Sequence, residues 1–405
     1  MRRWPLGILI VALVAAGSFF LLAPGMIERG TNKIDGKPLP QVSARAAALH
    51  KTLTIVDLHS DTLLWKRSIL DRADRGHMDL PRLADGNVAL QVLASTTKSP
   101  KGQNYDANSG DTDNITTLAI AQLQPLRTWG SLLERSLWHA EKLHRAVAAS
   151  GGQLRAVAAP ADVDALLAGR RGKAVPVGAM LSIEGLQGLE GKLANLDRLY
   201  AAGFRMAGPA HFFDNEVAGS MHGLKKGGLT PFGRQVVQAM EAKGMIVDIA
   251  HCSKACVADI LKMARRPVVS SHGGVQATCR VNRNLDDDQI RGVAATGGLI
   301  GIGYWDAAVC DTSPTSIAKA MKHVKDLVGI QYVALGSDYD GATTVRFDTS
   351  KLVQMTQALI DAGFTEDEIR AAMGGNAIRV LKAGIAPMAS PAPPPSAPTP
   401  STPAR

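Results

Sequence analysis

Short aliphatic runs alternate with longer amphipathic stretches through most of this 405-residue chain. Aliphatic runs of this length are typical of strands buried on both faces of a parallel sheet. We expect strands at residues 53–58, 88–94, 175–183, 205–209, 245–250, 267–271, 298–303 and 332–336. Eight strands separated by helices predict an α/β fold, specifically a closed (β/α)8 barrel. An open doubly wound sheet is the alternative, and the lack of a GxGxxG or Walker motif after the first run weakens it.

Most of these runs stop at a side chain that can bind a metal or transfer a proton. These side chains are His59 and Asp61, Glu184, His211, His251, His272, and the pair Asp338 and Asp340. In a barrel the carboxyl ends of the strands meet at one rim, which is where the active sites of this fold lie. We therefore predict that these residues form one metal site at that rim.

The residue types favour zinc over harder cations. His59 and Asp61 are two positions apart on a strand and point the same way, and His251 and His272 can add two imidazoles. Imidazole together with carboxylate suits Zn²⁺ better than Mg²⁺ or Ca²⁺. There are more candidate ligands than one tetrahedral ion needs. A carboxylate such as Glu184 can bridge two ions about 3.5–4 Å apart, and a hydroxide held between them is a nucleophile near neutral pH.

Each candidate residue also has a purely structural interpretation. Glu184 and Asp338 could cap turns, His211 could be a hydrogen-bonded core histidine, and His251 could precede a helix that begins after Ser253. The remaining histidines follow no strand and are expected at the surface or in packing: His50, His77, His139, His144, His222 and His323. The coincidence of ligand-type residues at five or six strand ends is what favours the metal site.

The two ends of the chain differ in composition from its middle. In residues 1–29, Arg2 and Arg3 precede an apolar run at 6–23, which predicts an uncleaved membrane anchor. A cleaved signal peptide is the main alternative. Either one places residues 30–384 outside the cytoplasm, in the periplasm or at the cell surface, and cleavage would make the protein secreted. Residues 385–405 consist mostly of Pro, Ala, Ser and Thr and are predicted to be disordered.

Charge and cysteine content exclude two classes of protein. The chain has 45 Lys and Arg against 36 Asp and Glu, a net charge of +9, with no block of like charges. Nucleic-acid binding proteins cluster their basic residues, so we expect no nucleic-acid partner. Four cysteines in 405 residues are too few for a disulfide scaffold.

Several motifs taken together resemble the membrane dipeptidase (renal dipeptidase) family of zinc peptidases, which are amidohydrolase-like hydrolases. The resemblance covers residues 48–384. The matching segments, in the order and spacing of the family, are VDLHSD at 56–61, HMDLPRLADGNVALQ at 77–91, SIEGLQGL at 182–189, GLTPFGRQVVQAMEAKGMIVDIAHCS at 228–253, PVVSSHGG at 267–274, NRNLDDDQI at 282–290, GSDYDG at 336–341 and GGNAIRVL at 374–381. The family implies a (β/α)8 barrel with two zinc ions per chain.

The resemblance also implies roles for individual residues. His59 and Asp61 would bind one zinc ion, His251 and His272 the second, and Glu184 would bridge them. His211 resembles the histidine that polarises the substrate, and Arg283 the arginine that binds the carboxylate of a dipeptide. Asp338 resembles the acid that contacts the substrate amino group and takes the proton from the nucleophile.

Cysteine positions and one loop complete the comparison with the family. Cys279 and Cys310 fall where animal members have a disulfide, and an exported domain permits that bond. Cys252 and Cys256 are expected as small packing residues. The segment at 305–310 is less polar and less aromatic than in animal members, so the preferred substrate side chains stay open.

The resulting hypothesis is a zinc-dependent dipeptidase that uses a metal-bridging hydroxide and tolerates D-residues at the second position. Dipeptides are the expected partners, the membrane is contacted through the N-terminal segment, and a homodimer is left open. One alternative keeps the metal site but acts on N-acyl amino acids or β-lactams. A second alternative is a non-catalytic barrel that acts as a surface binding protein.

Overall fold

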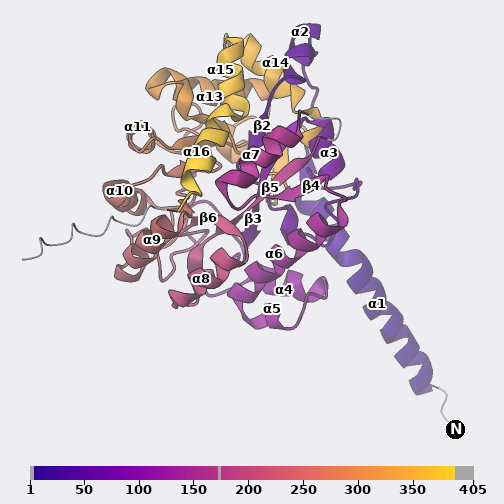
Figure 1. Ribbon diagram of the computed structural model, residues 1–405. Coiled ribbons are helices and arrows are strands. Elements are labelled where there is room, and N and C mark those ends of the chain that lie inside the picture. Colours follow the sequence, from indigo (N-terminus) through magenta and orange to yellow (C-terminus); the bar gives the residue numbers. More distant parts are fainter. Residues whose placement is uncertain (1–3, 172–174, 388–405) are drawn as a thin grey trace, which may run out of the picture.

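A parallel sheet of eight strands curls into a barrel at the centre of the computed structural model, which describes residues 4–171 and 175–387 (Figure 1). The strands are β2 (Ile55–Asp57), β3 (Val88–Thr96), β5 (Val177–Glu184), β6 (Phe204–Gly208), β7 (Ile246–Val247), β8 (Val269–Ser270), β9 (Leu299–Ile302) and β10 (Val333–Leu335). Their order is β7-β6-β5-β3-β2-β10-β9-β8. A parallel bridge between Asp248 and Val269 joins the two ends of this series. The predicted (β/α)8 barrel is confirmed.

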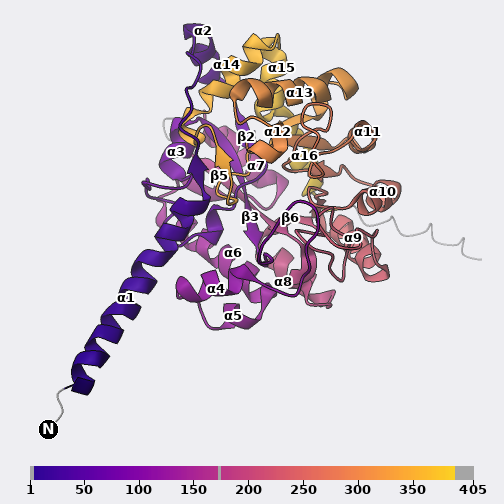
Figure 2. The same ribbon diagram turned by 180° about the vertical axis from the view of Figure 1, so that it is seen from behind.

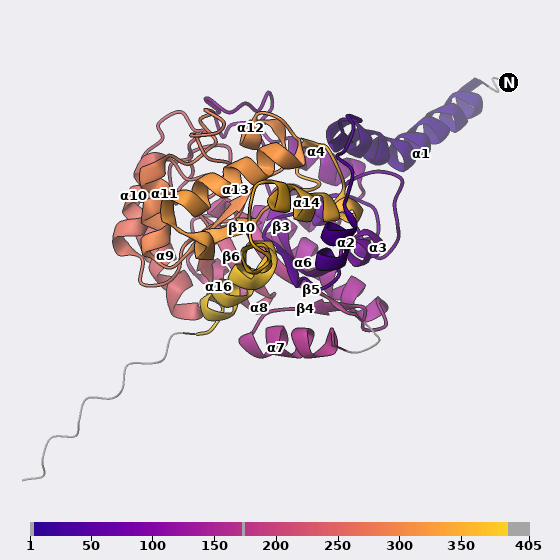
Figure 3. The same cartoon turned by 90° about the horizontal axis from the view of Figure 1, so that it is seen from above.

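Helices surround the strands in the view from above (Figure 3). They are α2 (Ala44–His50), α3 (Leu80–Asp85), α4 (Asn114–Ala121), α5 (Arg127–Gly130), α6 (Leu132–Ala149), α7 (Pro160–Gly169), α8 (Ala194–Ala201), α9 (Pro231–Lys243), α10 (Lys254–Met263), α11 (Asp287–Ala295), α12 (Asp306–Val309), α13 (Pro314–Val328), α14 (Val353–Asp361), α15 (Glu366–Arg370) and α16 (Asn376–Gly384). Side-chain caps fix several helix starts: Thr230 accepts a hydrogen bond from the Gly233 amide and Ser253 one from the Cys256 amide. These bonds satisfy amides that have no partner inside the helix.

Aliphatic side chains fill the barrel and close its floor. Val56, Leu90, Met180, Met206 and Ile246 belong to one buried cluster, which also takes in side chains of α7 and α16. Burying each such side chain contributes about 2 kcal/mol of transfer free energy. The residues predicted as metal ligands lie at the opposite, open rim.

Two predicted strands are shorter in the structure, because the Asp248 carboxylate accepts hydrogen bonds from backbone amides that would otherwise pair between the strands. The expected strands at 245–250 and 267–271 reduce to β7 and β8. Asp248 Oδ1 accepts hydrogen bonds from the amides of Ser271 and Ala250, at 2.9 and 3.0 Å. The chain therefore leaves the regular ladder at Asp248. A further strand, β4 (Leu154–Ala156), pairs with β5 outside the barrel series.

The segment at 365–383 forms two helices that are divided at a glycine. Helices α15 and α16 flank a π-helical turn at Ala371–Gly375. A Cβ atom at Gly374 would lie 1.9 Å from the carbonyl oxygen of Thr54, just before β2. The close approach of helix and strand thus requires glycine and interrupts the helix.

The apolar N-terminal run forms one long helix, α1 (Trp4–Thr31), which extends away from the barrel (Figures 1 and 2). Its last turn packs onto the barrel, where Glu28 is 1% exposed. Within residues 4–171 and 175–387, no helix combines the length and apolar character that a bilayer span requires. This finding gives the predicted membrane anchor no support. Most of the predicted disordered tail, residues 388–405, lies outside the described part of the chain.

A two-stranded sheet lies beside the barrel and includes the segment that follows α1. Strand β1 (Lys33–Ile34) runs parallel to β11 (Thr344–Val345). The second strand comes shortly after β10, so residues near the N-terminus contact the loop at the open rim.

Cys279 and Cys310, which are 31 positions apart in the sequence, are joined by a disulfide. Cys252 and Cys256 are free and buried. The crosslink ties the segment before α11 to the end of α12, both above the open rim of the barrel.

Replacing both Cys279 and Cys310 with serine should lower the free energy of unfolding by about 3 kcal/mol, because the unfolded chain regains loop entropy. Urea titration followed by circular dichroism measures this change. Reductant should shift the unfolding midpoint of the wild-type protein but not that of the double variant. Equal stability of the two proteins without reductant would contradict the prediction.

Candidate metal centre

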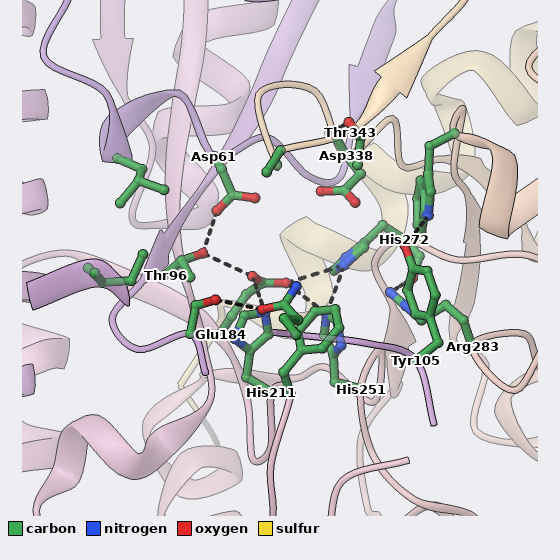
Figure 4. Close-up of a pocket in the computed structure, with 18 residues that line it drawn as sticks. Asp61, Thr96, Tyr105, Glu184, His211, His251, His272, Arg283, Asp338 and Thr343 are labelled. Carbon is green, nitrogen blue, oxygen red and sulfur yellow. Dashed lines mark hydrogen bonds and ion pairs between the residues drawn. The ribbon is translucent and has the colours of Figure 1, made fainter. Parts of the chain in front are cut away.

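The strand ends meet around a cavity of about 140 Å³ at the open rim of the barrel (Figure 4). Its walls include Asp61, Thr96, Tyr105, Glu184, His211, His251, His272, Arg283, Trp305 and Asp338. These side chains come from segments that follow β2, β3, β6, β7, β8, β9 and β10, or from the last residues of β3 and β5. The structure thus brings the residues predicted from the strand ends, except Asp340, into one site.

The Glu184 carboxylate lies at the centre of four imidazoles. Its Oε1 is 3.2 Å from Nε2 of His251, 3.2 Å from Nε2 of His272 and 3.4 Å from Nε2 of His59. Its Oε2 is 3.2 Å from Nε2 of His211. One carboxylate therefore faces ligand-type nitrogen atoms from four different loops.

Acidic groups gather on the other side of His59. Its Nε2 lies 3.3 Å from Oδ2 of Asp61 and 3.8 Å from Oδ1 of Asp338. The Thr96 hydroxyl is 2.6 Å from Oδ1 of Asp61 and 3.0 Å from Oε2 of Glu184. Thr96 therefore joins the Asp61 side of the site to the Glu184 side.

Burial and the neighbouring charges shift the pKa values of these groups in opposite directions. Burial alone would raise the pKa of Glu184, but His211 and His59 hold it well below its ordinary value. Burial alone would lower the pKa of His59, but Glu184, Asp61 and Asp338 raise it to about 10. Burial raises the pKa of Asp338 well above its ordinary value, and the charges of Asp61 and Glu184 add to that shift. This negative environment around His59 favours a proton or a metal cation.

His251 and His272 are neutral donors. Burial holds the pKa of each imidazole well below its ordinary value. Their Nε2 atoms lie only 3.1 Å apart. Two neutral imidazoles that direct Nε2 toward each other and toward a carboxylate are arranged as metal ligands are.

A relay of hydrogen bonds fixes the orientation of His272. The Ser271 hydroxyl donates to Oδ2 of Asp248, and Oγ of Ser271 lies 2.8 Å from Nδ1 of His272. Since the hydroxyl proton is used on Asp248, Nδ1 of His272 carries the proton that bonds to Ser271. Nε2 of His272 is then unprotonated and free to bind a cation.

Arg283 forms the wall opposite the carboxylates and is 2% exposed. Its guanidinium donates to the carbonyl oxygens of Ala250 and His272 and lies 5.6 Å from the centre of the Trp305 ring. Trp305 Nε1 donates to the Tyr105 hydroxyl at 3.0 Å. These contacts hold the positively charged guanidinium of Arg283 at the edge of the cavity.

The grouping of donor atoms differs in detail from the predicted pairs. Three sets of donors lie within 4.8 Å of one another: His59, Glu184 and His272; Glu184, His211 and His251; and His59, Asp61 and Asp338. Glu184 belongs to two of these sets, which suits a shared ligand. His211 lies as close to Glu184 as the predicted ligands do, and Asp340 instead bonds to Thr62 and Arg67.

Sequence reasoning did not identify four contributors to this site: Thr96, Tyr105, Asp248 and Ser271. Thr96 ends β3, so a hydroxyl at a strand end was an available signal. Asp248 and Ser271 each lie within three positions of a predicted ligand, in segments that were expected to be strand. Tyr105 lies in a polar loop between β3 and α4, and as the one aromatic residue of that loop it was an available signal.

Sequence comparison places the chain among peptidases. The sequence model of the family described as "Membrane dipeptidase (Peptidase family M19)" matches residues 43–389. The chain is 28% identical over 397 residues to a protein named dipeptidase aclJ from Aspergillus oryzae, covering 92% of this chain and 86% of the relative. A Klebsiella pneumoniae protein described as uncharacterized and encoded in the pqqA 5' region is 31% identical over 256 residues, which cover 59% of this chain and 92% of that protein.

Solved structures share the fold at low sequence identity. The probable dipeptidase PvdM from Pseudomonas aeruginosa superposes with a TM-score of 0.71 at 19% identity, covering 84% of this chain and 98% of that one. A metallopeptidase from Rhodobacter sphaeroides, liganded with a phosphinate mimic of the dipeptide L-Ala-D-Ala, gives a TM-score of 0.66 at 22% identity, covering 82% and 99%. The chain belongs to the membrane dipeptidase family, peptidase family M19, and is a metallo-dipeptidase of that metal-dependent family.

Proposed function

We propose that this protein hydrolyses dipeptides with two zinc ions held between His59, Asp61, Glu184, His251 and His272. The observation that carries the proposal is the position of Glu184. Its Oε1 faces three imidazoles at 3.2–3.4 Å, and its Oε2 faces the imidazole of His211 at 3.2 Å. A carboxylate with ligand-type donors on both oxygens is suited to bridging two ions.

The residues present fit zinc. Imidazole nitrogen and carboxylate oxygen are its usual donors, and at least two of the imidazoles are neutral through burial. The relay from Asp248 through Ser271 leaves Nε2 of His272 unprotonated. When bound, the zinc ions would supply a bridging hydroxide near neutral pH and polarise the scissile carbonyl.

The side chains around this centre orient the substrate and handle its protons. Arg283 is placed to bind the substrate carboxylate through its planar guanidinium. Asp338, 3.8 Å from His59, is placed to bind the substrate ammonium, and its raised pKa suits it to accept a proton. His211 is placed to donate a hydrogen bond to the carbonyl oxygen as negative charge develops there.

The cavity favours very short substrates. Its volume of about 140 Å³ is bounded by the acidic Asp338 on one side and Arg283 on another, so both charged ends of a peptide are recognised within one small space. The Rhodobacter sphaeroides relative is liganded with a mimic of L-Ala-D-Ala. We propose that this chain likewise accepts a D-residue at the second position.

A second substrate class shares the same recognition element. Arg283 recognises a carboxylate regardless of the bond that is cleaved, so N-acyl amino acids and β-lactams are the alternative substrates. A panel of L,L-dipeptides, L,D-dipeptides, N-acyl amino acids and β-lactams, with and without chelator and added Zn²⁺, tests this choice. The proposal expects metal-dependent turnover with dipeptides of both kinds, and turnover confined to the other classes would overturn it.

The disulfide favours a location outside the cytoplasm. Reducing cytosolic conditions keep most thiols unpaired, whereas exported proteins retain such bonds. We therefore propose an extracytoplasmic enzyme. Fractionation of cells that express the full chain tests this location.

Glu184→Gln and His251→Ala should each reduce dipeptide hydrolysis to background and lower the zinc content of the purified protein. The first change removes the shared charge and the second removes one imidazole from the same set of donors. Activity assays with elemental analysis measure both effects. His144→Ala changes an exposed histidine outside the site and should leave both values unchanged. Activity like that of the wild type in both site variants would contradict the metal assignment.

Ser271→Ala should weaken zinc binding by roughly tenfold to a hundredfold, because His272 loses the partner that fixes its tautomer. Competition with a chelator measures this affinity directly. Ser182→Ala is a matched control, since the Ser182 hydroxyl is buried and has no hydrogen-bond partner among the described residues. Equal affinities in the two variants would show that the relay from Asp248 does not support His272.

Arg283→Lys should raise KM for dipeptides by about tenfold or more. The reason is that a guanidinium can donate to both carboxylate oxygens at once, whereas the lysine ammonium acts as a point charge. The same change should have little effect on KM for a dipeptide amide, which lacks that carboxylate. Steady-state kinetics with the two substrates gives the comparison. An equal loss with both substrates would assign Arg283 a structural role.

A further inference from the structure

The loop that carries Asp338 has a strained backbone. Asp338, Asp340 and Ala342 have φ values of +59°, +64° and +59°. Residues other than glycine rarely adopt this left-handed region, and each costs free energy unless surrounding contacts hold it. The loop also lines the cavity through Asp338, Gly341, Ala342 and Thr343. Its conformation therefore depends on contacts made from outside the loop.

Residues 28–35, at the end of α1 and just after it, supply many of those contacts. We call them the N-terminal strap. The Ala342 amide donates to Oδ1 of Asn32 at 2.8 Å. The Lys33 amide donates to the carbonyl oxygen of Thr343 at 3.0 Å, and the pairing of β1 with β11 continues this contact. The strap thus bonds the backbone of the loop immediately after its left-handed residues.

A buried ion network ties the same strap to Asp340. Arg67 Nε donates to Oε1 of Glu28 at 2.6 Å, and the other side of the Arg67 guanidinium donates to the carboxylate of Asp340. Arg75 Nε donates to Oε2 of Glu28 at 2.8 Å. Glu28 is 1% exposed and Asp340 is fully buried, so removing one partner leaves an uncompensated charge in the interior.

The Asp340 end of this network reaches the metal centre. Its carboxylate accepts hydrogen bonds from the Thr62 hydroxyl and the His77 amide, both at 2.6 Å. Thr62 directly follows Asp61, and Asp340 is two positions from Asp338. Two hydrogen bonds therefore link Glu28 of the strap to Asp340, and a third links Asp340 to Thr62 on the Asp61 side.

We propose that the N-terminal strap is a positioning element for catalysis, which holds the loop so that Asp338 faces the substrate. The strap lies before residue 43, where the match to the family model begins, so this support comes from outside the matched part of the chain. The inference rests on the proposed dipeptidase function and on the role of Asp338 in it. None of the five predicted metal ligands lies on this loop, and only Asp61 is near the network, as the residue before Thr62. We therefore expect a change in the strap to act on turnover more than on metal loading.

Two substitutions of one residue test the strap in the full-length protein. Asn32→Ala removes the acceptor for the Ala342 amide. Asn32→Asp keeps an acceptor oxygen for that amide. It replaces Nδ2, which is buried without a hydrogen-bond partner among the described residues, with a second oxygen and so adds a negative charge. We expect Asn32→Ala to lower kcat for a dipeptide by roughly tenfold or more, in line with the effect of misplacing a reacting group. Asn32→Asp should restore most of that loss.

A second pair of variants tests the ion network. Glu28→Gln removes the buried charge, and Glu366→Gln makes the same chemical change in an exposed ion pair with Arg45. We expect a fall in kcat with KM changed by less than about threefold for Glu28→Gln, since Arg283 still binds the substrate. Zinc content should stay at the wild-type level in all four variants. Glu366→Gln should leave kcat unchanged.

Comparison of kcat with the melting temperature distinguishes a positioning role of the strap from a purely stabilising one. A merely structural strap would lower the melting temperature of Asn32→Ala while kcat at 25 °C stays within about twofold of the wild type, and that result would overturn the inference. Equal losses in Asn32→Ala and Asn32→Asp would also overturn it, even if Glu28→Gln fails to fold. If the wild-type protein itself does not hydrolyse dipeptides, the proposed function fails instead.

Discussion

The site depends on one carboxylate that must remain charged where almost no water reaches it. Glu184 is buried at the end of β5, and burial alone would favour its neutral form. The charges of His211 and His59 and the hydrogen bonds from His211 and His251 reverse that preference, so the carboxylate and these histidines stabilise one another. This is possible only if the loops after β2, β6, β7 and β8 all converge on the end of β5, which is what a closed barrel imposes.

The same geometry explains why so much of the site could be predicted. Strands such as β3 and β5 are buried on both faces, so their sequences are mostly aliphatic, and residues that can bind a metal come at or after their ends. Glu184, His251 and His272 are recognisable for that reason. Parallel strands in a barrel bring their carboxyl ends together, so strand order alone places these residues in one site.

Other parts of the site depend on bonds between residues that look ordinary in sequence. Asp248 and Ser271 orient His272, yet an aspartate and a serine near a strand end are as typical of caps and turns. The interruption at Gly374 follows from the nearby carbonyl of Thr54, which only the packed structure reveals. Glu28 lies in an apolar helix that sequence reasoning treats as separate from the barrel, although its charge is buried against the barrel.

The residues of the site are held in place in two different ways. Predicted ligands such as Glu184 end barrel strands, whose positions are set by many backbone hydrogen bonds and by the packed interior. Asp338 lies instead on a loop with left-handed residues, whose conformation relies on side-chain and backbone contacts from residues 28–35. A change in the strap should therefore alter substrate placement while the metal centre stays intact. The N-terminal segment thus belongs physically to the catalytic unit.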